Sequence, residues 1–547
     1  MFIFILLVSG FSSGLINPQS QKHSQRLQRH YVIEEDSAKV AWETVALSAA
    51  EICPEEIEVG RNAPKGLRGT WYVNGLSSCQ IGNRLVHPFE AHGFIKAFRF
   101  DGEGKVTMRS RFVETDVQRY EAIAKRPLYR GAMSNVANFE KFPDFLLNAV
   151  SPSTRAVAQL AVRCWGKDQL FASTDNAPWF RLDPVTLETI GEESMNNHLL
   201  RGTKMLAHTR IDHDRNVMCA AAAEFDAFEN TTKLILFEFD VKGNQLSRIE
   251  LTEPFFIFHD FAITQDFWII PINPGKFDLD KLPNFIFGRA PATDIFQLDF
   301  NRNLCLLLVP RGERKNFIGK DAADQAIRID LGCFGATFHV GPHWIDSHGR
   351  LIAHAFIFER YIFGGEMGFD IRKQQFNPTP WSLSNGGPKL HRIIIDNVRS
   401  VPKLTEFIKL SEIPTDMPTM HPDRDGYKSR YVYGTAGIRD IGWFPFNSLV
   451  KFDLDTDQVD IWRPSDPQVR HYCVTSEPYF LPRLQQSDSN DDDDDGWLLS
   501  LLHDVANNVT ELQIFDAKHL STGPIWSTSI GKLWPWNVHT TFDPKLY

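Results

Sequence analysis

The chain has 547 residues, of which 43% are hydrophobic, and this is enough for one large core or for several smaller ones. The net charge of −10 and the scattered basic residues argue against nucleic acid as a partner. Seven widely spaced cysteines without a CxxC pair argue against a disulfide framework and against a thiolate metal site.

The first 36 residues have the composition of a targeting leader that lies outside the fold. Residues 1–10 ("MFIFILLVSG") are a short apolar run that ends in small residues, which is typical of a signal peptide. Residues 11–36 are rich in Ser and Gln and have no acid before Glu34, which is typical of a transit peptide. In tandem, the two segments resemble the bipartite leaders of algae with secondary plastids and predict a plastid location. A secretory signal followed by a spacer, with a secreted or endomembrane location, is the alternative.

The rest of the chain is predicted to be a helical extension followed by one all-β domain. Residues 37–60 contain "SAKVAWETVALSAAEI", which favours a helix. From residue 61 to residue 547, short runs rich in Phe, Val, Ile, Tyr and Trp recur between Gly, Asp and Asn turns. Many of these runs pair across a short polar turn, as in "IKAFRFDGEGKVTMRSRFVET". This rhythm predicts a propeller or several sandwiches. A second helix is expected within residues 139–161.

The common motifs of nucleotide-binding proteins, serine hydrolases and zinc proteases are absent from the sequence. An acid-rich stretch, "QQSDSNDDDDDG", covers residues 485–496. Its spacing matches no calcium-binding loop, so a solvated insertion is the expected interpretation and a calcium site the alternative.

Four of the eighteen histidines lie in apolar or aromatic strand-like segments that are far apart in the sequence. One histidine in such a setting is usually a core residue that hydrogen-bonds a neighbour. Four of them, each in a separate hairpin, are better explained if their strands converge on an axis, as the inner strands of propeller blades do. The candidate metal ligands are His208 in "KMLAHTRID", His259 in "FIFHDFAIT", His339 in "GATFHVGPH" and His539 in "LWPWNVHTTF".

From Ala63 to Phe542 the chain resembles the carotenoid cleavage oxygenase family. The landmarks occur in the family's order and include "PKGLRGTWYVNG", "PWFRLDPVTLETIG", "HDFAIT", "SEPYFLPR", "DDGWLLSLLHD" and "NVHTTF". The resemblance implies a seven-bladed β-propeller in which a few helices and loops form a cap over the iron-bearing axial face. It also implies one Fe(II) per subunit, with the four histidines as its ligands.

The resemblance further implies that carboxylates orient three of the ligand histidines, and the matching positions are Asp175, Asp416 and Glu477. A carboxylate on the second imidazole nitrogen fixes the tautomer and increases donation to the metal. The family usually has Glu at the first two positions, so the shorter acids here would need altered geometry or a bridging water. Asp260 follows His259 directly and should point to the opposite face of the strand, so it is not expected to orient that histidine.

Three motifs depart from the family pattern. After His339 the chain reads "GPHWID" where the family usually has Asn-Ala-aromatic-Glu, so Ile345 takes the Glu position and His343 competes for assignment as a ligand. After "HPF" the chain reads "EAHG" in place of Asp-Gly-Asp-Gly, and "VNGL" replaces Arg-Asn-Gly-Pro. These differences suggest a divergent substrate.

The activity that the resemblance implies is oxidative cleavage of one C=C bond of a carotenoid or apocarotenoid by dioxygen, giving carbonyl products. Four neutral imidazoles leave two of six octahedral positions of Fe(II) open, and no catalytic residue is expected beyond the iron shell. The substrate should enter through an aromatic tunnel, which suits the 42 Phe and 13 Trp of the chain. The alternatives are an isomerase or isomerohydrolase on the same iron scaffold, a stilbenoid-cleaving dioxygenase, and an inactive binding propeller.

An apolar substrate dissolves in lipid, so the tunnel mouth is expected to contact a membrane surface. The segment "KLPNFIFGRA" places Leu282, Phe285, Ile286 and Phe287 beside basic residues, a composition that suits interfacial docking. "FPDFLLNAV" is a second candidate, and burial in a blade or in the cap is the alternative for both. The sequence has no apolar run near the roughly 20 residues that span a bilayer, and it does not indicate an oligomeric state.

Overall fold

The computed structural model describes residues 37–151, 155–166, 168–311, 325–464, 472–483 and 493–545. The predicted leader and most of the acid-rich stretch lie outside the described residues. Within them, seven sheets of four to six strands form the blades of a β-propeller, as the sequence motifs predicted. Two further pairs of short strands lie outside the blades: β3 (Gln80–Ile81) with β4 (Arg84–Leu85), and β23 (Phe369–Asp370) with β24 (Gln375–Phe376).

The blades follow one another along the chain, except that the first is built from both ends. The first blade has the order β1 (Cys53–Gly60), β6 (Val106–Phe112), β5 (Phe94–Asp101), β2 (Arg68–Gly75) and β36 (Asn537–Asp543). The second has β10 (Thr189–Glu192), β9 (Phe180–Leu182), β8 (Gln169–Ser173) and β7 (Ala161–Trp165). The third has β11 (Met205–Asp212), β12 (Val217–Asp226), β13 (Thr231–Phe239) and β14 (Gln245–Pro254).

The fourth blade is the most irregular, because its inner edge is divided. It contains β15 (Phe256–Ile257), β16 (Ala262–Ile263), β17 (Phe267–Phe277), β18 (Phe296–Leu298), β19 (Cys305–Pro310) and β20 (Ile327–Asp330). The fifth has β21 (Ala336–Ile345), β22 (Leu351–Phe358), β25 (Lys389–Asp396) and β26 (Lys403–Lys409).

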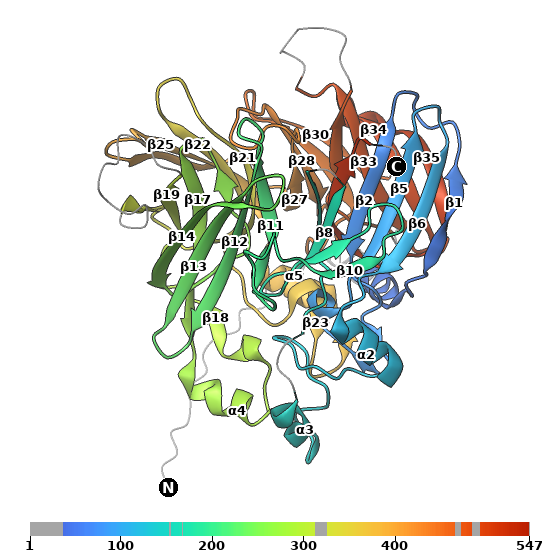
Figure 1. Ribbon diagram of the computed structural model, residues 1–547, viewed down its shortest axis with the longest axis vertical. Helices are drawn as coiled ribbons and strands as arrows, with labels where there is room; N and C mark the ends of the chain where they lie inside the picture. Colours follow the sequence, from blue (N-terminus) through green and yellow to red (C-terminus); the bar gives the residue numbers. More distant parts are fainter. Residues whose placement is uncertain are drawn as a thin grey trace, which may run out of the picture.

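The last two blades complete the ring. The sixth has β27 (Thr415–Thr419), β28 (Tyr431–Ala436), β29 (Ser448–Asp453) and β30 (Gln458–Trp462). The seventh has β31 (Tyr472–Val474), β32 (Tyr479–Pro482), β33 (Gly496–Asp504), β34 (Val509–Asp516) and β35 (Pro524–Lys532). In Figure 1 these C-terminal strands, in red, lie beside the blue N-terminal ones, and β36 pairs with β2 to close the ring.

Apolar side chains fill the spaces between neighbouring blades on both of their faces. In β13, Leu234 and Leu236 face a cluster shared with the fourth blade, which includes Trp268. The alternate residues Ile235 and Phe237 face a cluster shared with the second blade. A strand buried on both faces reads as a continuous apolar run, which explains why the blades lack a simple alternation of polar and apolar residues.

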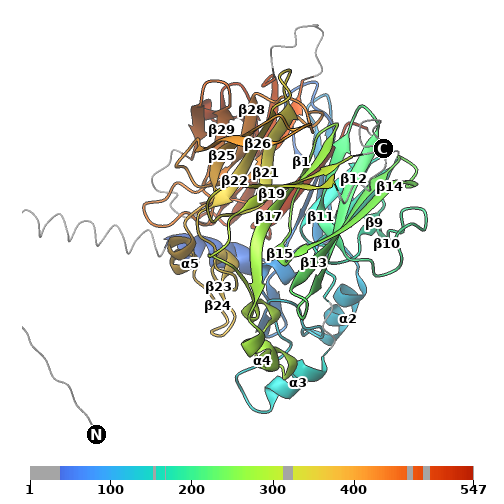
Figure 2. The same cartoon turned by 90° about the vertical axis from the view of Figure 1, so that its left-hand side faces the viewer.

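Short helices and loops gather at one end of the propeller and form a cap (Figures 1 and 2). The α-helices of the cap are α2 (Asp116–Ala124), α3 (Asp144–Val150), α4 (Leu282–Ile286) and α5 (Pro378–Asn385). The 3₁₀ segments are η1 (Pro88–Glu90), η2 (Leu279–Lys281), η3 (Ala292–Asp294) and η5 (Glu366–Gly368), and η6 (Leu520–Thr522) lies between β34 and β35. The cap covers the apolar cavity described below.

The helical prediction for residues 37–60 is right only for residues 37–47, where Trp42 packs edge-on against Phe444 and Trp536. Cys53–Gly60 forms β1, which pairs with β6 at the outer edge of the first blade. Ile57 and Val59 alternate with acids there, and this two-residue period belongs to an edge strand rather than a helix. The second expected helix is also shorter than residues 139–161, because α3 covers Asp144–Val150 only.

Candidate metal centre

The four histidines converge on the propeller axis from four different blades. His208 lies on β11, His339 on β21 and His539 on β36, the inner strands of the third, fifth and first blades. His259 lies in the turn between β15 and β16, at the inner edge of the fourth blade. One ring nitrogen of each lies within 4.8 Å of the others, although the residues are far apart in the sequence.

The ring nitrogens form a set of donors that a cation would satisfy. The Nε2 atoms of His208 and His259 lie 3.2 Å apart, and the Nε2 atoms of His339 and His539 are buried without a hydrogen-bond partner in the described residues. Buried polar atoms normally have a partner, so four convergent imidazole nitrogens fit a bound metal ion. Neutral nitrogen donors suit iron, zinc or copper, whereas calcium and magnesium prefer oxygen.

The environment lowers the pKa of two of these imidazoles, which favours their neutral form, and raises the pKa of a third. Burial and the three neighbouring histidines hold the pKa of His208 well below its usual range. Burial also lowers the pKa of His539, against the opposing effect of Glu477. Burial opposes the charge on His339, but Asp416 more than offsets it, so its pKa is raised. A hydrogen bond from Nδ1 to Asp416 leaves Nε2 to face the centre.

The structure places each of the three predicted acids beside its histidine. Asp175, in the turn after β8, forms a hydrogen bond with Nδ1 of His259, and its other oxygen accepts from the backbone N–H of Ala207 at 2.8 Å. Asp416, on β27, has its Oδ1 atom 2.6 Å from Nδ1 of His339. Both aspartates therefore reach their histidines directly, without the bridging water considered for a shorter acid.

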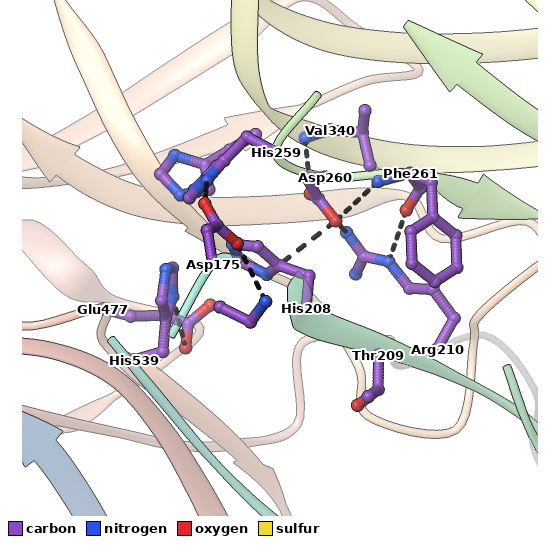
Figure 3. A network of polar contacts seen from close by, with 12 residues as sticks. Asp175, His208, Thr209, Arg210, His259, Asp260, Phe261, Val340, Glu477 and His539 are labelled. Atoms are coloured by element: carbon purple, nitrogen blue, oxygen red, sulfur yellow. Dashed lines mark hydrogen bonds and ion pairs between the residues drawn. The ribbon is translucent and has the colours of Figure 1, made fainter. Parts of the chain in front are cut away.

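Glu477 has a looser relation to its histidine. It lies between β31 and β32, and its Oε2 atom is 3.6 Å from Nδ1 of His539 (Figure 3). The same oxygen accepts from the backbone N–H of Thr540 at 3.1 Å. A separation of 3.6 Å is beyond the usual hydrogen-bond range, so this contact is weaker than those that the two aspartates make.

Asp260 points away from His259, as its position next to that residue predicted. Its carboxylate pairs with the guanidinium of Arg210 and accepts from the backbone N–H of Val340 at 3.0 Å (Figure 3). It also lies 3.8 Å from Nδ1 of His208, the histidine for which the sequence suggested no acid. The contacts of Asp260 with Arg210 and Val340 thus link the third, fourth and fifth blades directly behind the centre.

His343 is not part of the centre. Its Nδ1 atom donates to the carbonyl of Gly341 at 2.9 Å, and its Nε2 atom accepts from the backbone N–H of Ile263 at 3.3 Å. Both ring nitrogens are therefore satisfied by the backbone, and the ring takes no place among the four convergent histidines.

A large cavity opens onto the centre from the cap side. Its volume is about 560 Å³, and it reaches His259, His339 and His539. Aromatic residues dominate its wall, among them Phe225, Phe255, Phe258, Phe277, Phe285, Phe296, Phe338, Phe358, Tyr361, Phe363, Trp381, Trp443, Phe444 and Phe446. Two buried acids, Glu90 and Glu366, also line it and were not identified from the sequence.

A second cavity, of about 50 Å³, lies against the same centre and has a different character. It is lined by charged residues that include Arg163, Arg210, Asp260 and Glu477. This space can hold only small polar molecules. The two cavities give the centre one wide apolar approach and one narrow polar one.

The segments considered for membrane contact lie in the cap. Ile286 and Phe287 are 56% and 59% exposed, whereas Leu282 and Phe285 are half-buried. Phe285 lines the large cavity and stacks under the guanidinium of Arg130. On neighbouring α3 and just before it, Phe142, Leu146, Leu147 and Val150 are also exposed. Among the described residues, no helix is long and apolar enough to cross a membrane.

The fold and the site together define a propeller with a four-histidine axial centre beneath an aromatic cavity. The family model described as retinal pigment epithelial membrane protein matches residues 47–544. The chain therefore belongs to this family, that of the carotenoid cleavage oxygenases. This confirms the resemblance that the sequence motifs indicated.

Relatives of the chain are named as oxygenases acting on several kinds of alkene. The apocarotenoid-15,15′-oxygenase of Synechocystis is 29% identical over 490 residues, which cover 88% of this chain and 91% of the relative. Lignostilbene-alpha,beta-dioxygenase isozyme III of Sphingomonas paucimobilis is 24% identical, with 86% and 90% covered. The crystal structure of cobalt-substituted apocarotenoid oxygenase of Synechocystis superposes with a TM-score of 0.77 at 25% identity, covering 93% of this chain and 99% of that one.

Proposed function

We propose that the protein is a non-haem Fe(II) dioxygenase that cleaves one C=C bond of a carotenoid or apocarotenoid to two carbonyl products. The observation that carries the proposal is the aromatic cavity of about 560 Å³ that ends on four convergent histidines. The similarity to the apocarotenoid oxygenase of Synechocystis supports the choice of substrate class.

In this function, His208, His259, His339 and His539 hold the metal. Iron(II) bound there would supply the activation of dioxygen, since four ligands leave two of six positions open. Asp175 and Asp416 hold the Nδ1 protons of two of the histidines, which keeps the Nε2 lone pairs directed at the centre. The aromatic wall binds the polyene, orients it across the centre and excludes bulk water from the reacting bond. No side chain outside the ligand set has to donate or remove a proton.

The cap supports a further part of the proposal, which is access from a lipid surface. The exposed apolar residues of α3 and α4 adjoin Phe285, which lines the cavity. Docking of this patch would let an apolar substrate pass from a membrane into the cavity without crossing water. A plastid membrane is the location that the leader-like residues 1–36 favour.

Anaerobic metal analysis combined with product analysis tests the main proposal. We expect about one Fe(II) per chain and two carbonyl products from at least one member of a panel of carotenoids and apocarotenals. His339→Ala should lose both iron and turnover. His343→Ala is the matched control, because this histidine lies on the same strand and faces away from the centre. Equal iron content and turnover in wild type and His339→Ala would refute the assignment of the site.

Cleavage of a stilbenoid is the second candidate, favoured by the similarity to the lignostilbene dioxygenase. Including stilbenes in the substrate panel separates it from the first. Isotopically labelled dioxygen separates both from an isomerase or isomerohydrolase, since only cleavage places the label in the carbonyl products. A folded protein that binds iron but converts no substrate would favour a binding propeller.

A further inference from the structure

The ion pair between Arg210 and Asp260 lies behind the four histidines, on the side of the centre away from the large cavity (Figure 3). On β11, Leu206 lines the large aromatic cavity, whereas Thr209 and Arg210, which come after His208, line the small polar one. Asp260 lines the small cavity too. A substrate in the large cavity would therefore meet the histidines but not this ion pair.

The guanidinium of Arg210 is held through all three of its nitrogens. Nε donates to the main-chain carbonyl of Phe261 at 2.7 Å, and Nη2 donates to the carboxylate of Asp260 at 2.7 Å. Nη1 lies 3.7 Å from Oδ1 of a second carboxylate, that of Asp425. Because the group is planar and rigid, these contacts fix its orientation.

Asp260 connects the guanidinium to two segments that carry ligand histidines. Its carboxylate accepts from the backbone N–H of Phe261 at 2.8 Å and from that of Val340 at 3.0 Å. Phe261 comes two residues after His259, and Val340 directly follows His339. The backbone beside both histidines is therefore bound to one buried carboxylate.

Asp425 does the same for a third segment. It lies in the loop between β27 and β28, and its Oδ2 atom accepts from the backbone N–H of Ile211 at 3.1 Å. Ile211 comes three residues after His208 on β11. Arg210 and its two carboxylate partners thus hold the backbone next to three of the four ligand histidines.

Stability of the fold alone does not explain a charged cluster at this place. A buried ion pair is often no more stabilising than apolar side chains of similar volume. A metal centre, in contrast, needs ligands that neighbouring groups hold in the correct geometry, and loss of such groups weakens metal binding. The contacts described above go to the backbone beside the ligands, which is where such support acts.

We propose that Arg210 is a positioning residue for the metal centre. Together with its two carboxylate partners it fixes the backbone beside three ligand histidines, so that their imidazoles converge before the metal binds. This inference rests on the metal centre of the proposed function and is independent of the substrate.

The main test is Arg210→Lys, which keeps the positive charge but replaces three nitrogens in one plane with a single ammonium. Co(II) is added to the metal-free full chain, its affinity is measured by competition with a chromophoric chelator, and its d–d absorption is recorded. We expect the affinity to fall about 10-fold, as for other groups that orient metal ligands. The d–d bands should also change, because they report the geometry of the ligands.

Arg311→Lys is the matched control, since Arg311 also joins the third and fourth blades from a buried position. It donates to Glu238 and to Asp212 at 2.8 Å each, and to the carbonyl of Thr264 at 2.5 Å. All three of its nitrogens are thus used, but none of these partners lies within three residues of a ligand histidine. Both lysine variants should lower the midpoint of thermal unfolding, because each loses charge-assisted hydrogen bonds. Only Arg210→Lys should change the affinity for Co(II) and its d–d bands.

Two further measurements separate positioning from a general loss of structure. Binding of an apocarotenal, measured anaerobically by quenching of tryptophan fluorescence, should be unchanged in Arg210→Lys, because the ion pair faces away from the large cavity. Asp260→Asn keeps an acceptor for one backbone N–H but removes the charge that Arg210 binds, so it should also weaken Co(II) binding and change the d–d bands. If Arg210→Lys does not fold, Asp260→Asn decides the question.

The results distinguish failure of this inference from failure of the proposed function. The same Co(II) affinity and d–d bands in folded Arg210→Lys and Arg311→Lys would overturn the inference, even if wild type cleaves a polyene. Weaker binding of the apocarotenal by Arg210→Lys would also overturn it, because the damage would then extend beyond the centre. Co(II) binding that depends on Arg210, in a chain that cleaves no member of the substrate panel, would support the positioning role and refute the proposed reaction.

Discussion

Replacing Asp416 tests how strongly a carboxylate on the outer nitrogen of a ligand histidine supports metal binding. Its Oδ1 atom lies 2.6 Å from Nδ1 of His339 and also accepts from the backbone N–H of Met417 at 2.9 Å. In Asp416→Asn that backbone N–H still orients the amide oxygen toward the ring, so the tautomer is kept and only the charge is lost. We expect metal affinity to fall about 10-fold, the lower end of the range for such partners. Asp416→Ala removes both effects and should cost about 100-fold, or about 2.7 kcal/mol.

The assay is competition between the protein and a chromophoric chelator for Co(II), supported by anaerobic Fe(II) content after purification. Cobalt is a suitable probe because the related Synechocystis enzyme has been crystallised in a cobalt-substituted form. Met417→Leu is the control, because it changes the adjacent side chain and leaves the backbone N–H in place. The reasoning fails if Asp416→Ala binds Co(II) as tightly as Met417→Leu does, with both variants folded.

Three further predictions follow from distances and burial. Glu477→Gln should weaken Co(II) binding less than Asp416→Asn, because its carboxylate is 3.6 Å from Nδ1 of His539; an equal or larger loss would contradict the ranking. Phe287→Glu should reduce sedimentation with liposomes at least about 10-fold, whereas Val401→Glu, at a position that is even more exposed but lies between β25 and β26, should not. Lys96→Met should raise the free energy of unfolding by about 4 kcal/mol at pH 7, since burial lowers the pKa of Lys96 from 10.5 to about 7 and its Nζ atom has no hydrogen-bond partner in the described residues. In wild type the unfolded chain holds this proton up to pH 10.5, whereas the folded chain loses it near pH 7, so the stability of wild type should rise from pH 7 to 10.5. The difference in stability between Lys96→Met and wild type should therefore disappear across this range. Denaturant titrations that find a constant difference would contradict this account.

Much of the fold and the positions of the histidines could be predicted from the sequence, because they depend on local pattern and motif order. His208, His339 and His539 interrupt apolar strands in a way that is visible in the sequence. The strand Cys53–Gly60 was mistaken for helix because its alternating pattern is short and its partner, β6, lies about 50 residues later. The place of Glu90 and Glu366 on the cavity wall could not be predicted, since it depends on how the loops of the cap fold over the axis.

The two aspartates explain how the centre keeps direct contacts with acids shorter than those usual in the family. An aspartate reaches less far than a glutamate, so its backbone must lie closer to the histidine. In β27 the register shifts between Asp416 and Thr419, and Met417 adopts a φ of 53°, which marks a bulge at this point.

Asp175 reaches its histidine from a turn and not from a bulged strand. It lies in a turn after β8, where it contacts both His259 and the backbone N–H of Ala207, the residue before His208. It therefore ties two ligand-bearing segments together, one on β11 and the other between β15 and β16. Glu477, the one glutamate of the three, also accepts from a backbone N–H, that of Thr540, but its carboxylate stands farthest from its histidine. Because both aspartates already contact their histidines directly, a glutamate at position 175 or 416 would push the carboxylate against its histidine instead of improving the contact.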